Sequence, residues 1–65
     1  MPSEIRFTII RKTLEDHGWR LDRVKGSHHV FTKPGADTVS IPVHNNKVKP
    51  RYVRKVQKLI EEQGD

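Results

Sequence analysis

Residues 19–43 read WRLDRVKGSHHVFTKPGADTVSIPV, and this stretch decides the fold. Trp19 and Leu21 alternate with polar residues, a period of two that is typical of a half-buried strand. The same period returns further along and predicts three strands, over residues 19–22, 28–33 and 38–43. Short turns separate them, one around Gly26 and one at Pro34-Gly35, which suits the centre of a type II turn. Consecutive strands joined by short turns predict an antiparallel three-stranded meander.

A helical pattern precedes this meander. Apolar residues recur on one helical face from Phe7 to Leu14. Ser3 suits the N-cap position, and Gly18 supplies a stop because glycine enters the left-handed region without strain. These signals predict a helix from Ser3 to His17.

A second helical pattern follows the meander. After a polar loop over residues 44–49, Pro50 is well suited to the first turn of a helix. The apolar stripe of this helix consists of Val53, Val56 and Ile60. We expect residues 61–65 to fray.

The order of elements predicts an α+β fold. We expect an α-β-β-β-α two-layer sandwich in which both helices bury their apolar stripes against one face of the antiparallel three-stranded sheet. The 65 residues are expected to form a single domain over residues 1–65. No cysteine is present to form a disulfide bond, so the stability of the domain depends on a small core. The expected core residues are Phe7, Ile10, Leu14, Trp19, Leu21, Phe31, Ile41, Val56 and Ile60.

Positive charge is concentrated in two parts of the chain, around Arg23 and Lys25 and from Lys47 to Lys58. Thirteen Lys and Arg face eight Asp and Glu, and the net charge of +5 favours a polyanionic partner such as RNA. No acidic residue interrupts the run from Lys47 to Lys58. A solvated helix face is the ordinary alternative, but such a face normally mixes both signs. The residues expected to contact RNA phosphates are Arg23, Lys25, Lys47, Arg51, Arg54, Lys55 and Lys58.

His28 is the strongest candidate for chemistry. Imidazole titrates near neutral pH and can move protons in phosphodiester cleavage, for which RNA supplies its own nucleophile, the 2′-hydroxyl. Strand alternation places His29 with Phe31 toward the helices and His28 on the open face of the sheet. A strand histidine often has only a structural role, and we favour that interpretation for His29. His44 is the candidate for a second acid–base group.

Other kinds of site have little support. The spacing of the histidines does not indicate a metal site, and the glycines form no phosphate-binding loop. We therefore expect no metal, no cofactor and no small-molecule ligand. The apolar runs are too short for a membrane span or a secretory signal, so a cytoplasmic location without membrane contact is expected.

Several motifs together resemble the HicA toxin family over nearly the whole chain: Gly18-Trp19, Gly26-Ser27-His28-His29-Val30-Phe31, Ile41-Pro42-Val43-His44 and a basic closing helix. The resemblance implies a fold like the double-stranded RNA-binding domain and ribosome-independent mRNA interferase activity. It also implies that His28, the histidine after Gly-Ser, is catalytic and that a HicB antitoxin covers the active face. The chain departs from the family where the last helix opens, with Pro50-Arg51-Tyr52-Val53 in place of Gly-Thr-Leu.

The residues and the resemblance together predict the toxin of a type II toxin–antitoxin system. In this hypothesis the protein is an mRNA endoribonuclease, and His28 takes the proton of the 2′-hydroxyl. The first alternative is a non-catalytic double-stranded RNA-binding module with the same fold. The second is a protein-interaction module whose basic face meets an acidic partner.

Overall fold

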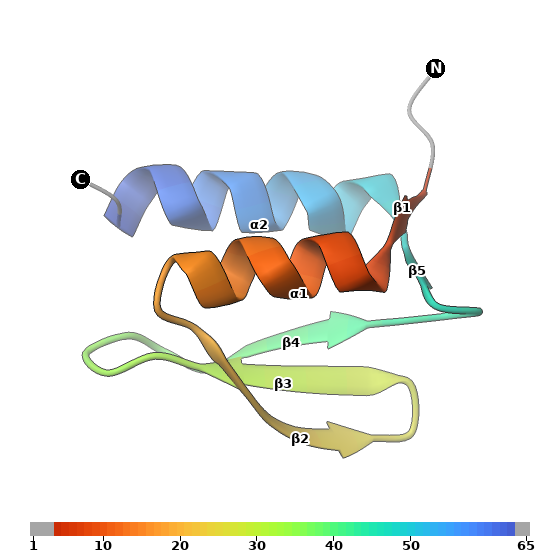
Figure 1. The fold of residues 1–65 in the computed structure, drawn as a ribbon, viewed down its shortest axis with the longest axis horizontal. Helices are drawn as coiled ribbons and strands as arrows, with labels where there is room; N and C mark the ends of the chain where they lie inside the picture. The colour runs from red at the N-terminus through yellow and green to blue at the C-terminus, as the bar shows by residue number, and fades with distance from the viewer. Residues whose placement is uncertain (1–3, 64–65) are drawn as a thin grey trace.

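The computed structural model describes residues 4–63 and shows an α+β fold in two layers (Figure 1). Strands β2 (Arg20–Lys25), β3 (His28–Thr32) and β4 (Val39–Pro42) form an antiparallel sheet in the order β2-β3-β4. Helices α1 (Phe7–Asp16) and α2 (Pro50–Gln63) lie together on one face of this sheet (Figure 1). No element within residues 4–63 covers the other face. The predicted fold class and meander are therefore confirmed.

An apolar core joins the helices to the sheet. Its buried members are Ile10, Leu14, Trp19, Phe31, Val39, Ile41, Val43, Val48, Val53 and Val56. Phe7, Leu21 and Ile60, which were also expected in the core, are half-buried at its edge. Burial of a Val, Leu, Ile or Phe side chain contributes about 1.5–3 kcal/mol, so this cluster is the main source of stability.

Helix α1 ends as predicted. Gly18 has a φ of +91°, in the left-handed region where glycine carries no Cβ penalty. The backbone N–H of Gly18 donates to the carbonyl of Glu15 at 3.1 Å, and that of Trp19 donates to Leu14 at 2.9 Å. These two bonds form a Schellman motif, which closes the helix and turns the chain into β2.

The predicted start of α1 is wrong. Ile5–Arg6 forms a short strand, β1, that pairs with β5 (Lys47–Val48), so the helix begins only at Phe7. The first helical N–H, that of Phe7, donates to the carbonyl of Asn46 at 2.8 Å, and Arg6 provides no side-chain cap. Ser3, the predicted N-cap, lies outside the described residues.

The predicted polar loop over residues 44–49 is also wrong, because it contains a tight turn that leads into β5. Asn45 and Asn46 both have positive φ, of 53° and 64°, as a type I′ hairpin turn requires. The backbones of His44 and Lys47 exchange two hydrogen bonds of 3.0 and 2.9 Å across it. The turn returns the chain toward β1, which lies far away in the sequence.

The remaining boundaries differ less. Strand β2 continues to Lys25, so the turn before β3 is reduced to Gly26 and Ser27. Pro50 begins α2 as predicted. Residues 61–63 belong to α2, so the expected fraying does not occur there, and residues 64–65 lie outside the described part of the chain.

The core makes a stability prediction. Ile41 is fully buried between the sheet and the helices, whereas Ile9 on α1 is 54% exposed. We expect Ile41→Ala to lower the free energy of unfolding by about 2–5 kcal/mol, because it leaves a cavity. The matched change Ile9→Ala should alter it by less than about 0.5 kcal/mol. Urea unfolding of both variants measures the difference, and equal losses would contradict the packing described here.

Candidate active site

His28 and His29 point to opposite faces of the sheet. His28, the first residue of β3, is exposed, and strand alternation puts it on the face opposite to buried Phe31, which is the face that the helices leave free. His29 is half-buried, and its ring lies 4.4 Å from that of Phe7 on α1, measured between centroids. Nδ1 of His29 also lies 3.3 Å from the carbonyl oxygen of Ser27, which accepts its proton. These are the orientations that strand alternation predicted.

A β-bulge in β2 brings two cations to the face that carries His28. Leu21 pairs with Phe31 and Arg23 pairs with the next residue, Val30, so Asp22 is an extra residue without a partner. Directly paired side chains in antiparallel strands share a face. Arg23 therefore lies on the open face, and Lys25, opposite His28, does as well. Without the bulge, both would lie on the same side as Leu21, facing the helices.

A pocket opens beside His28. It lies where the start of β3, the end of β4 and the first turn of α2 meet, and its lining residues are Ser27, His28, Pro42, His44, Lys49, Arg51 and Tyr52. The backbone N–H of Val43 donates to the carbonyl of Ser27 at 2.7 Å and holds the two strand ends together. The pocket thus combines two imidazoles with two cations, a set suited to proton transfer at a phosphate ester.

Three residues near His28 were not singled out from the sequence. Lys49 and Tyr52 line the pocket, and Ser40 places its hydroxyl oxygen 3.3 Å from Nδ1 of His28. Lys49 belongs to the basic run from Lys47 to Lys58, so its charge was visible in the sequence. Tyr52 and Ser40 had none, because their positions depend on how α2 and β4 pack.

The predicted cations near and on α2 lie in different places, and Arg51 belongs both to the pocket of His28 and to a basic helix face. Arg51 lines the pocket with His28, whereas Lys47 lines another hollow with Arg6 and Thr8, near the turn before β5. On α2, the exposed face opposite buried Val53 and Val56 is formed by Arg51, Arg54, Lys55 and Lys58. None of the ion pairs within residues 4–63 involves this face. We call it the basic face of α2.

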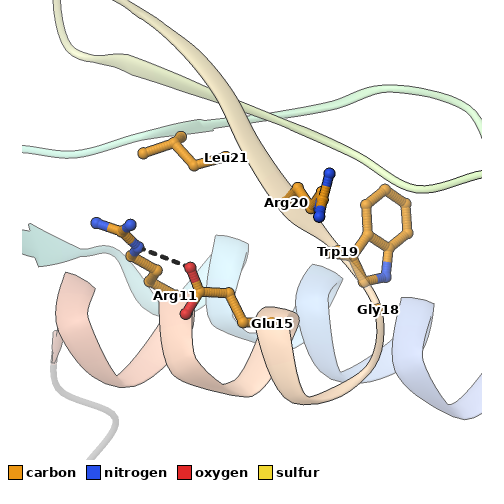
Figure 2. A pocket seen from close by; sticks show the side chains of 6 residues that line it. All are labelled: Arg11, Glu15, Gly18, Trp19, Arg20 and Leu21. Atoms are coloured by element: carbon orange, nitrogen blue, oxygen red, sulfur yellow. Dashed lines mark hydrogen bonds and ion pairs between the residues drawn. The ribbon is translucent and has the colours of Figure 1, made fainter.

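A second pocket lies at the junction of α1 and β2 and contains no histidine (Figure 2). Its charged groups are largely paired with each other, because Nε of Arg11 donates to a carboxylate oxygen of Glu15 at 3.0 Å. The indole of Trp19 points away from that pair (Figure 2), and its buried Nε1 has no hydrogen-bond partner among residues 4–63. The carboxylate of this pocket, that of Glu15, is held in the ion pair with Arg11, and no imidazole lines the hollow, so the candidate active site is the pocket of His28.

Among residues 4–63, no three His, Cys, Asp or Glu side chains are grouped closely enough to hold a metal ion. In the same part of the chain, neither helix combines the length and the apolar character that crossing a membrane requires.

Comparison with known proteins identifies the family. The family model described as "HicA toxin of bacterial toxin-antitoxin" matches residues 9–63. A search of curated proteins and a search of solved structures each returned no match. The expected likeness to the double-stranded RNA-binding domain therefore stays a prediction.

The opposite orientations of the two histidines predict opposite costs in stability. His29→Ala removes a ring that packs against Phe7, so we expect it to lower the free energy of unfolding by about 1 kcal/mol. His28→Ala removes an exposed ring and should change that energy by less than about 0.5 kcal/mol. Chemical denaturation of the two variants compares them. A larger loss for His28→Ala would contradict its placement on the open face.

Proposed function

The chain belongs to the HicA toxin family of bacterial toxin–antitoxin systems, and we propose that this toxin acts as a ribosome-independent mRNA endoribonuclease. The observation that carries the proposal is the pocket in which exposed His28 meets His44 beside Lys49 and Arg51. Phosphodiester cleavage in RNA needs a base near the 2′-hydroxyl, an acid near the leaving oxygen and cations around the phosphate. The residues of this pocket are of the types that supply all three.

In the proposed mechanism, His28 is the general base. It removes the proton from the 2′-hydroxyl while the 2′-oxygen forms a bond to phosphorus and the bond from phosphorus to the 5′-oxygen breaks. Protonated His44 donates its proton to the departing 5′-oxygen. Lys49 and Arg51 stabilise the negative charge that grows on the phosphate oxygens. The products are a 2′,3′-cyclic phosphate and a 5′-hydroxyl end.

The cations outside the pocket are proposed to hold the rest of the RNA. Lys25 lies on the open face of the sheet opposite His28, and Arg23 lies on the same face two residues before it, with its Nε also paired to Asp22 at 3.2 Å. The basic face of α2 would contact phosphates further along the strand, which adds salt-dependent affinity without sequence preference. Lys47, in the hollow near β5, would make a more peripheral contact.

We further propose that the single HicA-like domain spans residues 1–65 and is neutralised by a HicB-type antitoxin. An acidic partner fits the net charge of +5, and coverage of the open face would block access to His28. The substrate, mRNA, gives the toxin a cytoplasmic site of action.

Replacement of His28 tests the chemistry. We expect His28→Ala to reduce the rate of RNA cleavage by at least about 100-fold, because a general base contributes about that much. His17→Ala is the matched control, since His17 is exposed at the end of α1, where its Nδ1 donates to the carbonyl of Thr13. An RNA oligonucleotide with one 2′-deoxy position should resist cleavage at that position.

These measurements also separate the proposal from its alternatives. Wild-type cleavage by His28→Ala would remove His28 from the mechanism. Tight RNA binding by the wild-type protein without cleavage would instead favour a non-catalytic RNA-binding module.

The basic face of α2 makes a second, independent prediction. The double variant Arg54→Gln/Lys55→Gln should weaken RNA binding and reduce the slope of log K against log salt by about 0.7–0.9 for each phosphate that the protein no longer neutralises. The control Arg11→Gln/Lys12→Gln removes the same charge from α1, where each cation is paired with an acid. Binding titrations at several salt concentrations compare them. Equal weakening in both variants would show that only net charge matters.

A further inference from the structure

Ser40 and His28 come from neighbouring strands and meet on the open face of the sheet. Ser40 of β4 pairs with Val30, two residues after His28 in β3, so both side chains point away from the helices. The hydroxyl oxygen of Ser40 lies 3.3 Å from Nδ1 of His28. Within the described part of the chain, it is the only hydrogen bond between the ring of His28 and another side chain.

The position of Ser40 is determined by the core. Its neighbours in the strand, Val39 and Ile41, are 7% and 0% exposed and anchor β4 from the buried side. Their burial leaves the backbone at Ser40 little freedom, so the hydroxyl is presented to His28 from a rigid element. A group held in this way restricts the rotation of the imidazole ring.

The chemistry of histidine gives this contact a consequence. In neutral imidazole one nitrogen carries the proton and the other offers a lone pair, and a hydroxyl can either accept from the first or donate to the second. A hydroxyl that accepts the proton of Nδ1 leaves the lone pair on Nε2, which can then act as a base. When Nε2 takes up a proton, Nδ1 still donates to the same hydroxyl. One contact therefore suits both states of the ring.

We propose that Ser40 is a positioning residue that accepts the Nδ1 proton of His28 and presents Nε2 to the RNA as the base. The inference rests on the proposed nuclease function and deepens it, because it assigns a role to each nitrogen of the ring. Ser40 holds no phosphate in this scheme. Its loss should therefore affect turnover and leave RNA binding intact.

The test compares three variants of the full chain. Ser40→Ala removes the hydroxyl, Ser40→Thr retains it on a β-branched residue that suits a strand, and Thr32→Ala is the control. Thr32 lies on the open face in β3, opposite Arg20, and its replacement removes a hydroxyl that does not contact His28. Cleavage of an RNA oligonucleotide gives kcat and KM, and ¹⁵N NMR of the free protein reports which nitrogen of neutral His28 carries the proton.

We expect Ser40→Ala to lower kcat by about tenfold, the lower end of the loss seen when partners that orient metal-bound histidines are removed, with little change in KM. In the same variant the proton of neutral His28 should move from Nδ1 toward Nε2. Ser40→Thr should restore both properties, and Thr32→Ala should resemble the wild type. An unchanged kcat in Ser40→Ala, or an unchanged proton distribution, overturns the positioning role.

The failure of this inference can be told from the failure of the nuclease proposal. If His28→Ala cleaves RNA as well as the wild type, the nuclease mechanism falls and the role of Ser40 falls with it. If His28→Ala is inactive while Ser40→Ala keeps full turnover, only the role of Ser40 is overturned.

Discussion

The burial of one face of the β2-β3-β4 sheet against α1 and α2 is the constraint on which the rest of the structure depends. Trp19, Phe31 and Ile41 are among the largest fully buried side chains and are excluded from water on that side of the sheet. Because side chains alternate along a strand, the burial of Phe31 forces its neighbours Val30 and Thr32 toward the other face. The same alternation carries His28 to the open side. The position of the candidate base is thus a consequence of the core.

The short pairing of β1 with β5 brings the starts of α1 and α2 close together. In this pairing Ile5 and Arg6, just before α1, lie opposite Lys47–Val48, shortly before α2. The turn at Asn45 and Asn46 makes the pairing possible. As a result, the first turn of α2 lies against the ends of β3 and β4, where Lys49, Arg51 and Tyr52 complete the pocket of His28. Arg51 and Tyr52 belong to the stretch where this chain departs from the family's usual Gly-Thr-Leu. The pocket of His28 therefore includes residues from the stretch in which the sequence differs from the pattern that the resemblance implies.

The charges divide between two surfaces with different chemical consequences. Close to His28, Lys49 and Arg51 line the pocket, and in the proposed mechanism they stabilise the charge of one phosphate. The basic face of α2 extends beyond this pocket and can add affinity only along an extended polyanion. On α1, by contrast, Arg11 and Lys12 are paired with Glu15 and Asp16. Within residues 4–63, the cations of the pocket and of the basic face of α2 take part in no ion pair, whereas those on α1 do.

Local patterns in the sequence determined the three-strand meander, both helices, the stop at Gly18 and the outward orientation of His28. Each of these depends on residues close together in the chain, through a period of two, a helical stripe or a conformational preference of glycine. The tertiary structure alone decided the β1–β5 pairing, the burial of Val48 and the meeting of Ser40, His44 and Tyr52 around His28. It also decided the bulge at Asp22, which reverses the faces of Arg23 and Lys25. These features depend on contacts between distant segments, and a single sequence carries no local signal of which distant segments will pair.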